Sequence, residues 1–187
     1  MRVILMGPPG AGKGTQAKLL SAALQVPHIS TGELFRGQIA LGTPLGLEAA
    51  RFINQGEYVP DSVTNGMLES RLDHEDVQVG FLLDGHPRTL PQISALDEML
   101  EVNALGVDHV VELTVDIEAV VQRLLKRAVE QGRADDSEQV IRHRMKVYYE
   151  LTDPIAGVYA QRGLLRQVDG MGAVEDVTPR ILAALGA

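Results

Sequence analysis

Short apolar runs recur along the chain and end at glycine, proline or polar residues. They occupy residues 3–6, 81–83 and 109–115, with a weaker example at 164–168. A short continuous apolar run is typical of a strand that is buried on both faces, whereas a half-exposed strand alternates apolar and polar residues. The pattern therefore predicts four buried strands.

Between these runs the apolar residues follow a helical spacing of three and four. Three segments show it, at residues 17–24, 93–100 and 120–125. Strands that alternate with helices indicate βαβ units and a mostly parallel sheet covered on both faces. The chain has 187 residues, a length typical of one domain. The sequence thus predicts a single α/β domain.

Two segments interrupt this alternation. Residues 30–59 begin with Ser30-Thr31-Gly32-Glu33, a capping-box spacing that starts a helix. They continue with several glycines and Pro44, so we expect a small helical insertion with a hinge at each end. Residues 128–136 are polar and contain Gly132, and we expect a loop there.

Composition excludes several classes of function. The chain has 17 Lys and Arg against 25 Asp and Glu, a net charge of −8. This balance argues against binding to nucleic acid or to an anionic membrane surface. Cysteine is absent, which excludes disulfides and cysteine-bound zinc and fits a cytoplasmic protein. No apolar run approaches the roughly 18 residues of a spanning helix.

A glycine-rich loop follows the first predicted strand. It reads Gly7-Pro8-Pro9-Gly10-Ala11-Gly12-Lys13-Gly14-Thr15. Glycines allow backbone N–H groups to turn inward around a phosphate, and the helix N-terminus adds a positive field. Lys13 adds a full charge. Gly14 stands where a phosphate loop usually has a hydroxyl, which here comes one place later in Thr15. A simple strand-to-helix turn is the alternative.

This loop variant resembles that of the adenylate kinase family, and the resemblance extends over essentially the whole chain. Further matching pieces are Ser30-Thr31-Gly32-Glu33-Leu34-Phe35-Arg36, Gly56-Glu57-Tyr58-Val59-Pro60-Asp61, Asp84-Gly85-His86-Pro87-Arg88, Gln92, Gly132-Arg133-Ala134-Asp135-Asp136 and Val168-Asp169-Gly170. The resemblance implies a P-loop NTPase-like α/β fold with a five-stranded parallel sheet. It also implies a core of residues 1–29, 60–125 and 137–187, a monophosphate-binding insertion at 30–59 and a short mobile lid at 126–136.

The resemblance implies the reaction MgATP + AMP ⇌ 2 ADP. We therefore expect Mg²⁺ as the cofactor, ATP, AMP and ADP as partners, and a cytoplasmic monomer. Relatives with long lids sometimes hold zinc through cysteines, but this lid is short and cysteine is absent. No zinc site is expected.

Site residues also follow from the resemblance. Those expected to bind ATP are Gly10, Ala11, Gly12, Lys13, Gly14, Thr15, Arg123, Arg127 and Gly172. Those expected to bind AMP are Thr31, Arg36, Ile53, Glu57, Tyr58, Val59, Gly85, His86, Pro87, Arg88, Gln92, Arg133 and Arg144. Those expected to act in catalysis are Lys13, Arg88, Arg123, Arg133, Arg144, Asp135 and Asp136.

The charged residues themselves fit phosphoryl transfer, which needs positioning and cations more than covalent help. Arg123 and Arg127 are four apart and share one helix face, where an anion would relieve their repulsion. A solvated cationic face is the alternative. Asp84 ends a predicted strand, where it can hold Mg²⁺ through water or merely cap a turn. Asp135 and Asp136 can lock the closed lid or cap the next helix.

Thr31 and Gln92 favour adenine as the acceptor base. A glutamine amide both donates and accepts, matching the amino group and a ring nitrogen of adenine. Related pyrimidine-monophosphate kinases usually have alanine at the position of Thr31, so a UMP or CMP kinase is the weaker alternative. Gln92 also completes a capping-box spacing with Thr89, and both interpretations stay open.

The family commonly has Phe or Tyr where His86 stands, so the role of His86 is open. We expect residues 57–59 to offer backbone groups to the base, with Ile53 packed on it.

The alternative from another class of protein is a sensor that binds ATP without turnover. Such a sensor would be expected to lose the arginines or Asp84.

Overall fold

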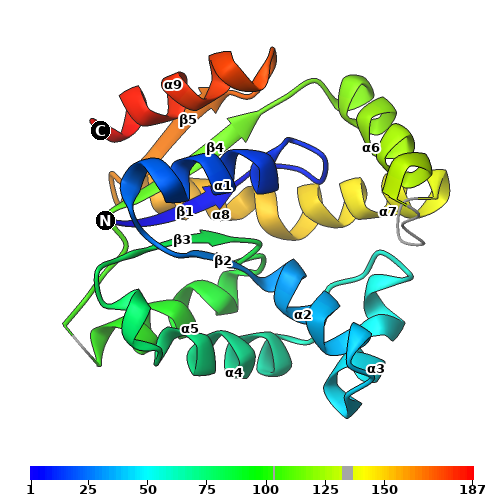
Figure 1. Ribbon diagram of the computed structural model, residues 1–187, viewed down its shortest axis with the longest axis horizontal. Helices are drawn as coiled ribbons and strands as arrows, with labels where there is room; N and C mark the ends of the chain where they lie inside the picture. The colour runs from blue at the N-terminus through cyan, green and yellow to red at the C-terminus, as the bar shows by residue number, and fades with distance from the viewer. Residues whose placement is uncertain (103, 132–136) are drawn as a thin grey trace.

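Five parallel strands form one sheet at the centre of the computed structural model (Figure 1). The strands are β1 (Arg2–Met6), β2 (His28–Ser30), β3 (Phe81–Asp84), β4 (His109–Thr114) and β5 (Leu165–Asp169), in the order β2-β3-β1-β4-β5. The structure describes residues 1–102, 104–131 and 137–187, and of residues 127–131 it describes the backbone alone. The four strands predicted from apolar runs are confirmed.

β1 lies in the middle of the sheet, where Leu5 pairs with Asp84 of β3 and Met6 pairs with Glu112 of β4. Since all the strands run parallel, their carboxyl ends meet at one edge of the sheet. β2 has a single apolar residue, Ile29, and no apolar run identifies it. Only the family resemblance implied a fifth strand.

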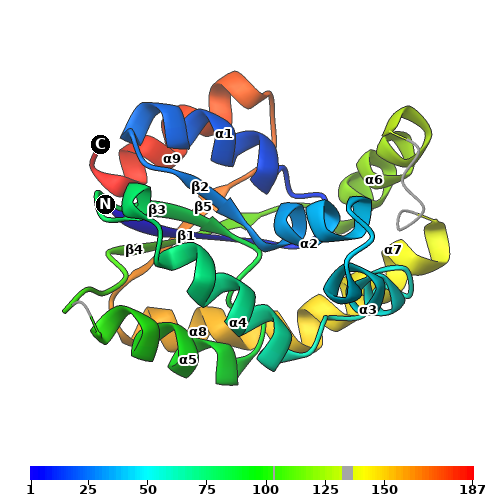
Figure 2. The ribbon, with the colours of Figure 1, turned by 60° about the horizontal axis from the view of Figure 1, so that its bottom comes forward.

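Helices cover both faces of the sheet (Figure 2). α1 (Lys13–Leu24) and α9 (Val174–Leu185) pack on one face, against Val3 and Leu5 of β1. α4 (Asp61–Leu72), α5 (Leu90–Glu101) and α8 (Asp153–Gln161) pack on the other, against Ile4 and Met6. Successive strand side chains point to opposite faces, so a continuous apolar run fills both cores.

Residues 30–59 fold as the predicted helical excursion beside the sheet edge. α2 (Thr31–Ala40) begins where the capping box predicted, with Ser30 Oγ accepting from Glu33 N at 3.4 Å. α3 (Pro44–Ile53) is capped by Thr43 Oγ1, which accepts from Gly46 N at 3.0 Å. Phe35, Ala49 and Val59 form a small core of their own.

The chain between β4 and β5 forms a second helical arm. α6 (Ile117–Gln131) packs on α7 (Glu138–Val147), which continues through the π-helix η3 (Tyr148–Thr152) into α8. α6 extends to Gln131, so the loop prediction is wrong for residues 128–131. Ala128, Glu130 and Gln131 are good helix formers, and nothing before Gly132 ends the helix.

Two smaller features complete the fold. A short 3-10 helix, η1 (Glu75–Val77), precedes β3. Within the described ranges, no helix is both long and apolar enough to cross a membrane.

Candidate functional site

The glycine-rich loop wraps between the end of β1 and the start of α1. Lys13 Nζ donates to Gly7 O at 2.7 Å and to Pro8 O at 3.0 Å, so the ammonium lies across the loop. Gly10 has a φ of +82°, and a Cβ there would come within 2.8 Å of Val120 and Leu124. Glycine at this position therefore allows α6 to pack directly against the back of the loop.

Asp84 lies beside this loop because β3 pairs with β1. Its side chain is 13% exposed, and its Oδ2 lies 3.9 Å from His28 Nε2. Among the described residues, no group of three or more His, Cys, Asp or Glu side chains could hold a metal. A cation at this edge would therefore rely on one carboxylate together with water and ligand oxygens, as Mg²⁺ commonly does.

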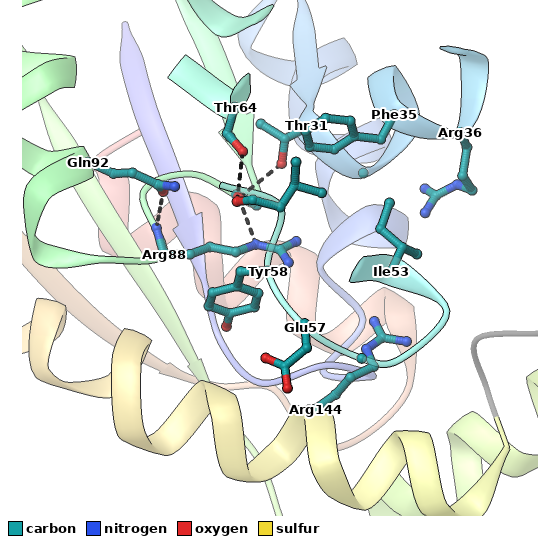
Figure 3. A pocket seen from close by; sticks show the side chains of 14 residues that line it. Thr31, Phe35, Arg36, Ile53, Glu57, Tyr58, Thr64, Arg88, Gln92 and Arg144 are labelled. Atoms are coloured by element: carbon teal, nitrogen blue, oxygen red, sulfur yellow. Dashed lines mark hydrogen bonds between the residues drawn. The ribbon is translucent and has the colours of Figure 1, made fainter. Parts of the chain in front are cut away.

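A cavity opens between the insertion and the end of β3 (Figure 3). Arg36 of α2, Arg88 from the loop after β3 and Arg144 of α7 extend toward it from separate elements. It is lined by Thr31, Gly32, Phe35, Arg36, Ile53, Gly56, Glu57, Tyr58, Val59, Thr64, Gly85, Arg88, Gln92 and Arg144. The fold thus brings together most residues predicted for the acceptor side.

The backbone of Gly85 links two walls of this cavity. Its carbonyl accepts from Thr31 Oγ1 at 2.9 Å and from Arg88 Nε at 2.8 Å, which ties α2 to the loop after β3. Gly85 has a φ of +86°, and a Cβ there would lie 2.6 Å from Thr31 Oγ1. The position therefore requires glycine for both its backbone angle and the close approach of Thr31.

Gln92 is held by hydrogen bonds on both sides of its amide. Oε1 accepts from Arg88 N at 2.7 Å, and Nε2 donates to Asp61 Oδ1 at 2.6 Å. Thr89 caps α5, with Oγ1 accepting from Gln92 N at 3.4 Å and donating to Asp61 Oδ2 at 2.8 Å. Gln92 therefore folds back to the start of α5, where it bonds Arg88 N just before the Thr89 cap, and its buried amide also lines the cavity. Recognition of adenine stays a prediction.

His86 is buried beneath the cavity wall, with 1% of its surface exposed. Its Nε2 lies 3.1 Å from Asn65 Oδ1, so Nε2 carries the proton. Nδ1 is buried and has no partner among the described residues. Burial and the charge of Arg88 lower the pKa of His86 to about 3. The ring is neutral near pH 7 and is a poor general base.

A second cavity joins the first to the phosphate loop. Its lining includes Lys13 of the loop, and both cavities share Tyr58, Gly85, Arg88 and Arg144. Arg88 and Arg144 thus lie at the junction between the two spaces. This arrangement places cations along one path from the insertion to the phosphate loop.

Several residues predicted for the nucleotide sites lie outside the lining of the two cavities. Arg123 is exposed on α6, next to the Leu124 contact with the loop. Gly172 follows β5 with a φ of +113°, near Asp176 and Arg180. Gly10, Ala11, Gly12, Gly14, Thr15, Arg123 and Gly172 line neither cavity. The Arg127 side chain, Arg133, Asp135 and Asp136 lie outside the described residues.

Sequence reasoning missed several groups that support the site. Asp61 bonds both Thr89 and Gln92, and it was visible only as the last residue of a matched motif. Thr152, from the π-helix, donates to Arg88 O at 3.0 Å. His143 Nε2 lies 2.6 Å from Glu57 Oε1. No local pattern marks Thr152 or His143, because their partners are distant in sequence.

The fold and the site define a class: an α/β phosphotransferase with a phosphate loop after the first strand. Comparison with known proteins gives the family. The family described as Adenylate kinase matches residues 5–164. The chain belongs to the adenylate kinase family, whose reaction is phosphoryl transfer from ATP to AMP giving two ADP.

The chain matches curated adenylate kinases over nearly their whole length. The enzyme of Kocuria rhizophila is 56% identical over 184 residues, covering 98% of both chains. That of a Nocardioides species is 54% identical, covering 99% of this chain and 97% of the relative. That of Xylella fastidiosa strain 9a5c is 49% identical over the full length of both. The match therefore includes the insertion and the helical arm between β4 and β5.

Proposed function

We propose that AMP binds in the cavity between the insertion and β3, while the phosphates of ATP bind at the phosphate loop. The observation that supports this assignment is the junction of the two cavities. Arg88 and Arg144 line both spaces, and Lys13 lines the second. An acceptor phosphate in the first cavity and a donor phosphate at the loop would therefore meet between these cations.

The acceptor cavity fits a nucleoside monophosphate. Arg36, Arg88 and Arg144 supply the charge for its phosphate, with Arg133 expected to join them from the lid. Thr31, Ile53 and Gln92 face the part of the cavity that would hold the base. The Gln92 amide keeps one N–H and one lone pair beyond its present bonds. These groups match the Watson–Crick edge of adenine.

The donor side uses the loop and the N-terminus of α1. Lys13 now donates to carbonyls of its own loop, and an incoming phosphate would take over those donor positions. The residues expected to bind ATP with it are Gly10, Ala11, Gly12, Gly14, Thr15, Arg123, Arg127 and Gly172. Mg²⁺ would be held by Asp84 through water and by phosphate oxygens, where it would neutralise charge on the nucleotide.

The transfer needs no general base, because a phosphate oxygen of AMP is already an adequate nucleophile. The contribution of the protein is alignment, charge stabilisation and exclusion of water. We propose that residues 30–59 and the lid at 126–136 close over the substrates, with Asp135 and Asp136 acting in the closed lid. Since one chain lines both cavities, we expect a monomer, and we expect it in the cytoplasm.

A coupled assay of ADP formation tests this function. Purified protein with ATP and AMP should produce ADP in a Mg²⁺-dependent reaction, and UMP or CMP should be poorer acceptors. ATP binding without ADP formation would favour the sensor alternative. Faster turnover with UMP or CMP would show that the acceptor assignment is wrong.

Hydrogen exchange tests the proposed closure. A bisubstrate mimic that joins two adenosines through five phosphates should protect residues 30–59 and 126–136, while β1 and β3 are already protected without it. Protection spread evenly over the chain, or missing from both segments, would contradict hinged closure.

A further inference from the structure

The side chain of Tyr58 connects three parts of the acceptor site. Tyr58 lies in the extended segment between α3 and α4, where it is half-buried and lines both cavities. Its hydroxyl is 2.7 Å from Thr152 Oγ1 of the π-helix η3. Its ring lies 4.9 Å from Arg88 Cζ. One side chain thus links the insertion, the helical arm and Arg88.

The direction of the hydrogen bonds follows from their chemistry. Thr152 Oγ1 donates to Arg88 O, a carbonyl that can only accept. The single hydroxyl proton of Thr152 is used there, so the Tyr58 hydroxyl must be the donor to Thr152 Oγ1. The result is a directed chain from Tyr58 through Thr152 to the backbone of Arg88. Thr152 is 5% exposed, so this chain is largely shielded from water.

Arg88 is fixed on several sides. Its backbone N–H is held by Gln92 Oε1 and its carbonyl by Thr152, while its Nε donates to Gly85 O at 2.8 Å. The Tyr58 ring supports the guanidinium at a cation–π distance. The two terminal guanidinium nitrogens of Arg88 point into the cavity (Figure 3). The orientation of these nitrogens therefore depends on the ring beside them.

We infer that Tyr58 is a positioning residue for phosphoryl transfer, acting through Arg88 by way of its ring and its hydroxyl. This inference rests on the proposed binding of the acceptor phosphate by Arg88. The π-helix contributes because its fifth residue, Thr152, presents the receiving hydroxyl, and π-helical turns are frequent at functional sites. The role belongs to the side chain, beyond the backbone contacts expected of residues 57–59.

Two variants separate the hydroxyl from the ring. Tyr58→Phe removes the bond to Thr152 and should lower kcat/KM for AMP about three- to tenfold, the effect of one hydrogen bond. Tyr58→Leu also removes the ring and should lower it a further threefold or so, the effect of an exposed cation–π contact. The KM for ATP should stay within about twofold of the wild-type value. Tyr149→Phe, in the same π-helix and 41% exposed, is the matched control and should leave both constants unchanged.

A double-variant cycle tests transmission through Thr152. Thr152→Val should weaken AMP use, and adding Tyr58→Phe should change it by less than about twofold more, because both variants break the same chain. Additive effects would overturn the hydroxyl link. A loss of stability to urea in Tyr58→Phe with unchanged kcat/KM for AMP would show that Tyr58 is only a structural contact.

A second readout does not depend on turnover. Exchange of the Arg88 Nε proton, measured by NMR, should quicken in Tyr58→Leu and stay slow in Tyr149→Phe. If wild-type protein fails to form ADP while this exchange still responds, the proposed function fails and the contact with Arg88 stands. If ADP forms and the exchange does not respond, positioning by the ring is wrong.

Discussion

The phosphate loop and the acceptor cavity are built in different ways. The loop is one continuous segment whose backbone and single lysine form the site, and Lys13 bonds carbonyls only five and six residues away. The acceptor cavity takes side chains from α2, from the loop after β3, from α5 and from α7. Substitution of the loop lysine should therefore affect chemistry alone, whereas substitutions around the cavity should affect both chemistry and folding.

Lys13→Ala should produce the largest effect and should break the chemistry alone. We expect kcat to fall by about three orders of magnitude or more, since a full charge aimed at the transferring phosphoryl is lost. The free energy of unfolding should change by less than about 1 kcal/mol, because Lys13 lies at the end of a loop and its bonds to Gly7 O and Pro8 O are local. Steady-state kinetics and urea unfolding measure the two quantities.

Lys18→Ala is the matched control for this experiment. Lys18 is exposed on the same helix and lines neither cavity, so activity should stay near the wild-type value. A folded Lys13→Ala protein that keeps more than a tenth of wild-type activity would refute the assignment of Lys13 to the donor site.

The same difference explains what the sequence could predict. The loop was recognisable because its function needs glycines and a lysine in a fixed local order between a strand and a helix. The bonds of Asp61 to Thr89 and Gln92 span 28 and 31 residues, and that of Thr152 to Arg88 spans 64. Such contacts depend on how the elements pack, which no local pattern records.

The secondary structure shows this limit too. Continuous apolar runs identified β1, β3, β4 and β5, because strands buried on both faces need them. β2 has only three residues at the sheet edge, where one face-filling side chain, Ile29, is enough. The loop prediction at residues 128–136 ends α6 too early, because a mostly polar segment indicates a loop although a helix with one exposed face also carries polar residues.

Gly85→Ala should affect both folding and acceptor use. The new Cβ would lie 2.6 Å from Thr31 Oγ1 and 2.9 Å from Arg88 Nη2, at a φ of +86°. We expect a loss of about 1–3 kcal/mol in the free energy of unfolding. The KM for AMP should rise about tenfold, and more than the KM for ATP. The reason is that Thr31 Oγ1 and Arg88 Nε would no longer both reach the Gly85 carbonyl oxygen.

Gly66→Ala is the matched control for Gly85→Ala. Gly66 lies within α4 with open space around its position for a Cβ, so alanine should stabilise the protein by up to about 1 kcal/mol. AMP use should not change. If Gly85→Ala leaves both stability and AMP use intact, then the Gly85 backbone does not hold Thr31 and Arg88 in place as the geometry indicates.

Gln92→Ala tests whether the Gln92 side chain recognises the base of the acceptor nucleotide. We expect AMP binding to weaken by about 1–3 kcal/mol, the usual effect of leaving buried polar partners unpaired, with ATP almost unaffected. Thr89→Ala removes the α5 cap and one bond to Asp61 but keeps the Gln92 amide, and should cost about 1 kcal/mol of stability with AMP preference intact. If AMP keeps its full advantage over UMP and CMP in Gln92→Ala, then Gln92 only supports the helix start and Asp61.

The smallest predicted effect is a change in the pH dependence of stability in His86→Phe, and it is confined to acid. Burial, with the nearby Arg88 charge, lowers the pKa of folded His86 to about 3, against about 6.5 in an unfolded chain. Above pH 6.5 both states are neutral and the shift has no effect on stability. Below pH 6.5 the unfolded chain binds a proton that the folded protein excludes, so stability falls until about pH 3.

Urea unfolding of both proteins measures this difference. Between pH 7 and 5.5 the wild-type protein should lose about 1 kcal/mol more stability than His86→Phe, which cannot bind that proton. Between pH 7 and 8 the two should change in parallel, because His86 is neutral there in both the folded and the unfolded wild-type chain. Equal losses of stability down to pH 5.5 would mean that His86 accepts a proton in the folded state, and that the acceptor wall admits charge where the geometry indicates a dry, neutral ring.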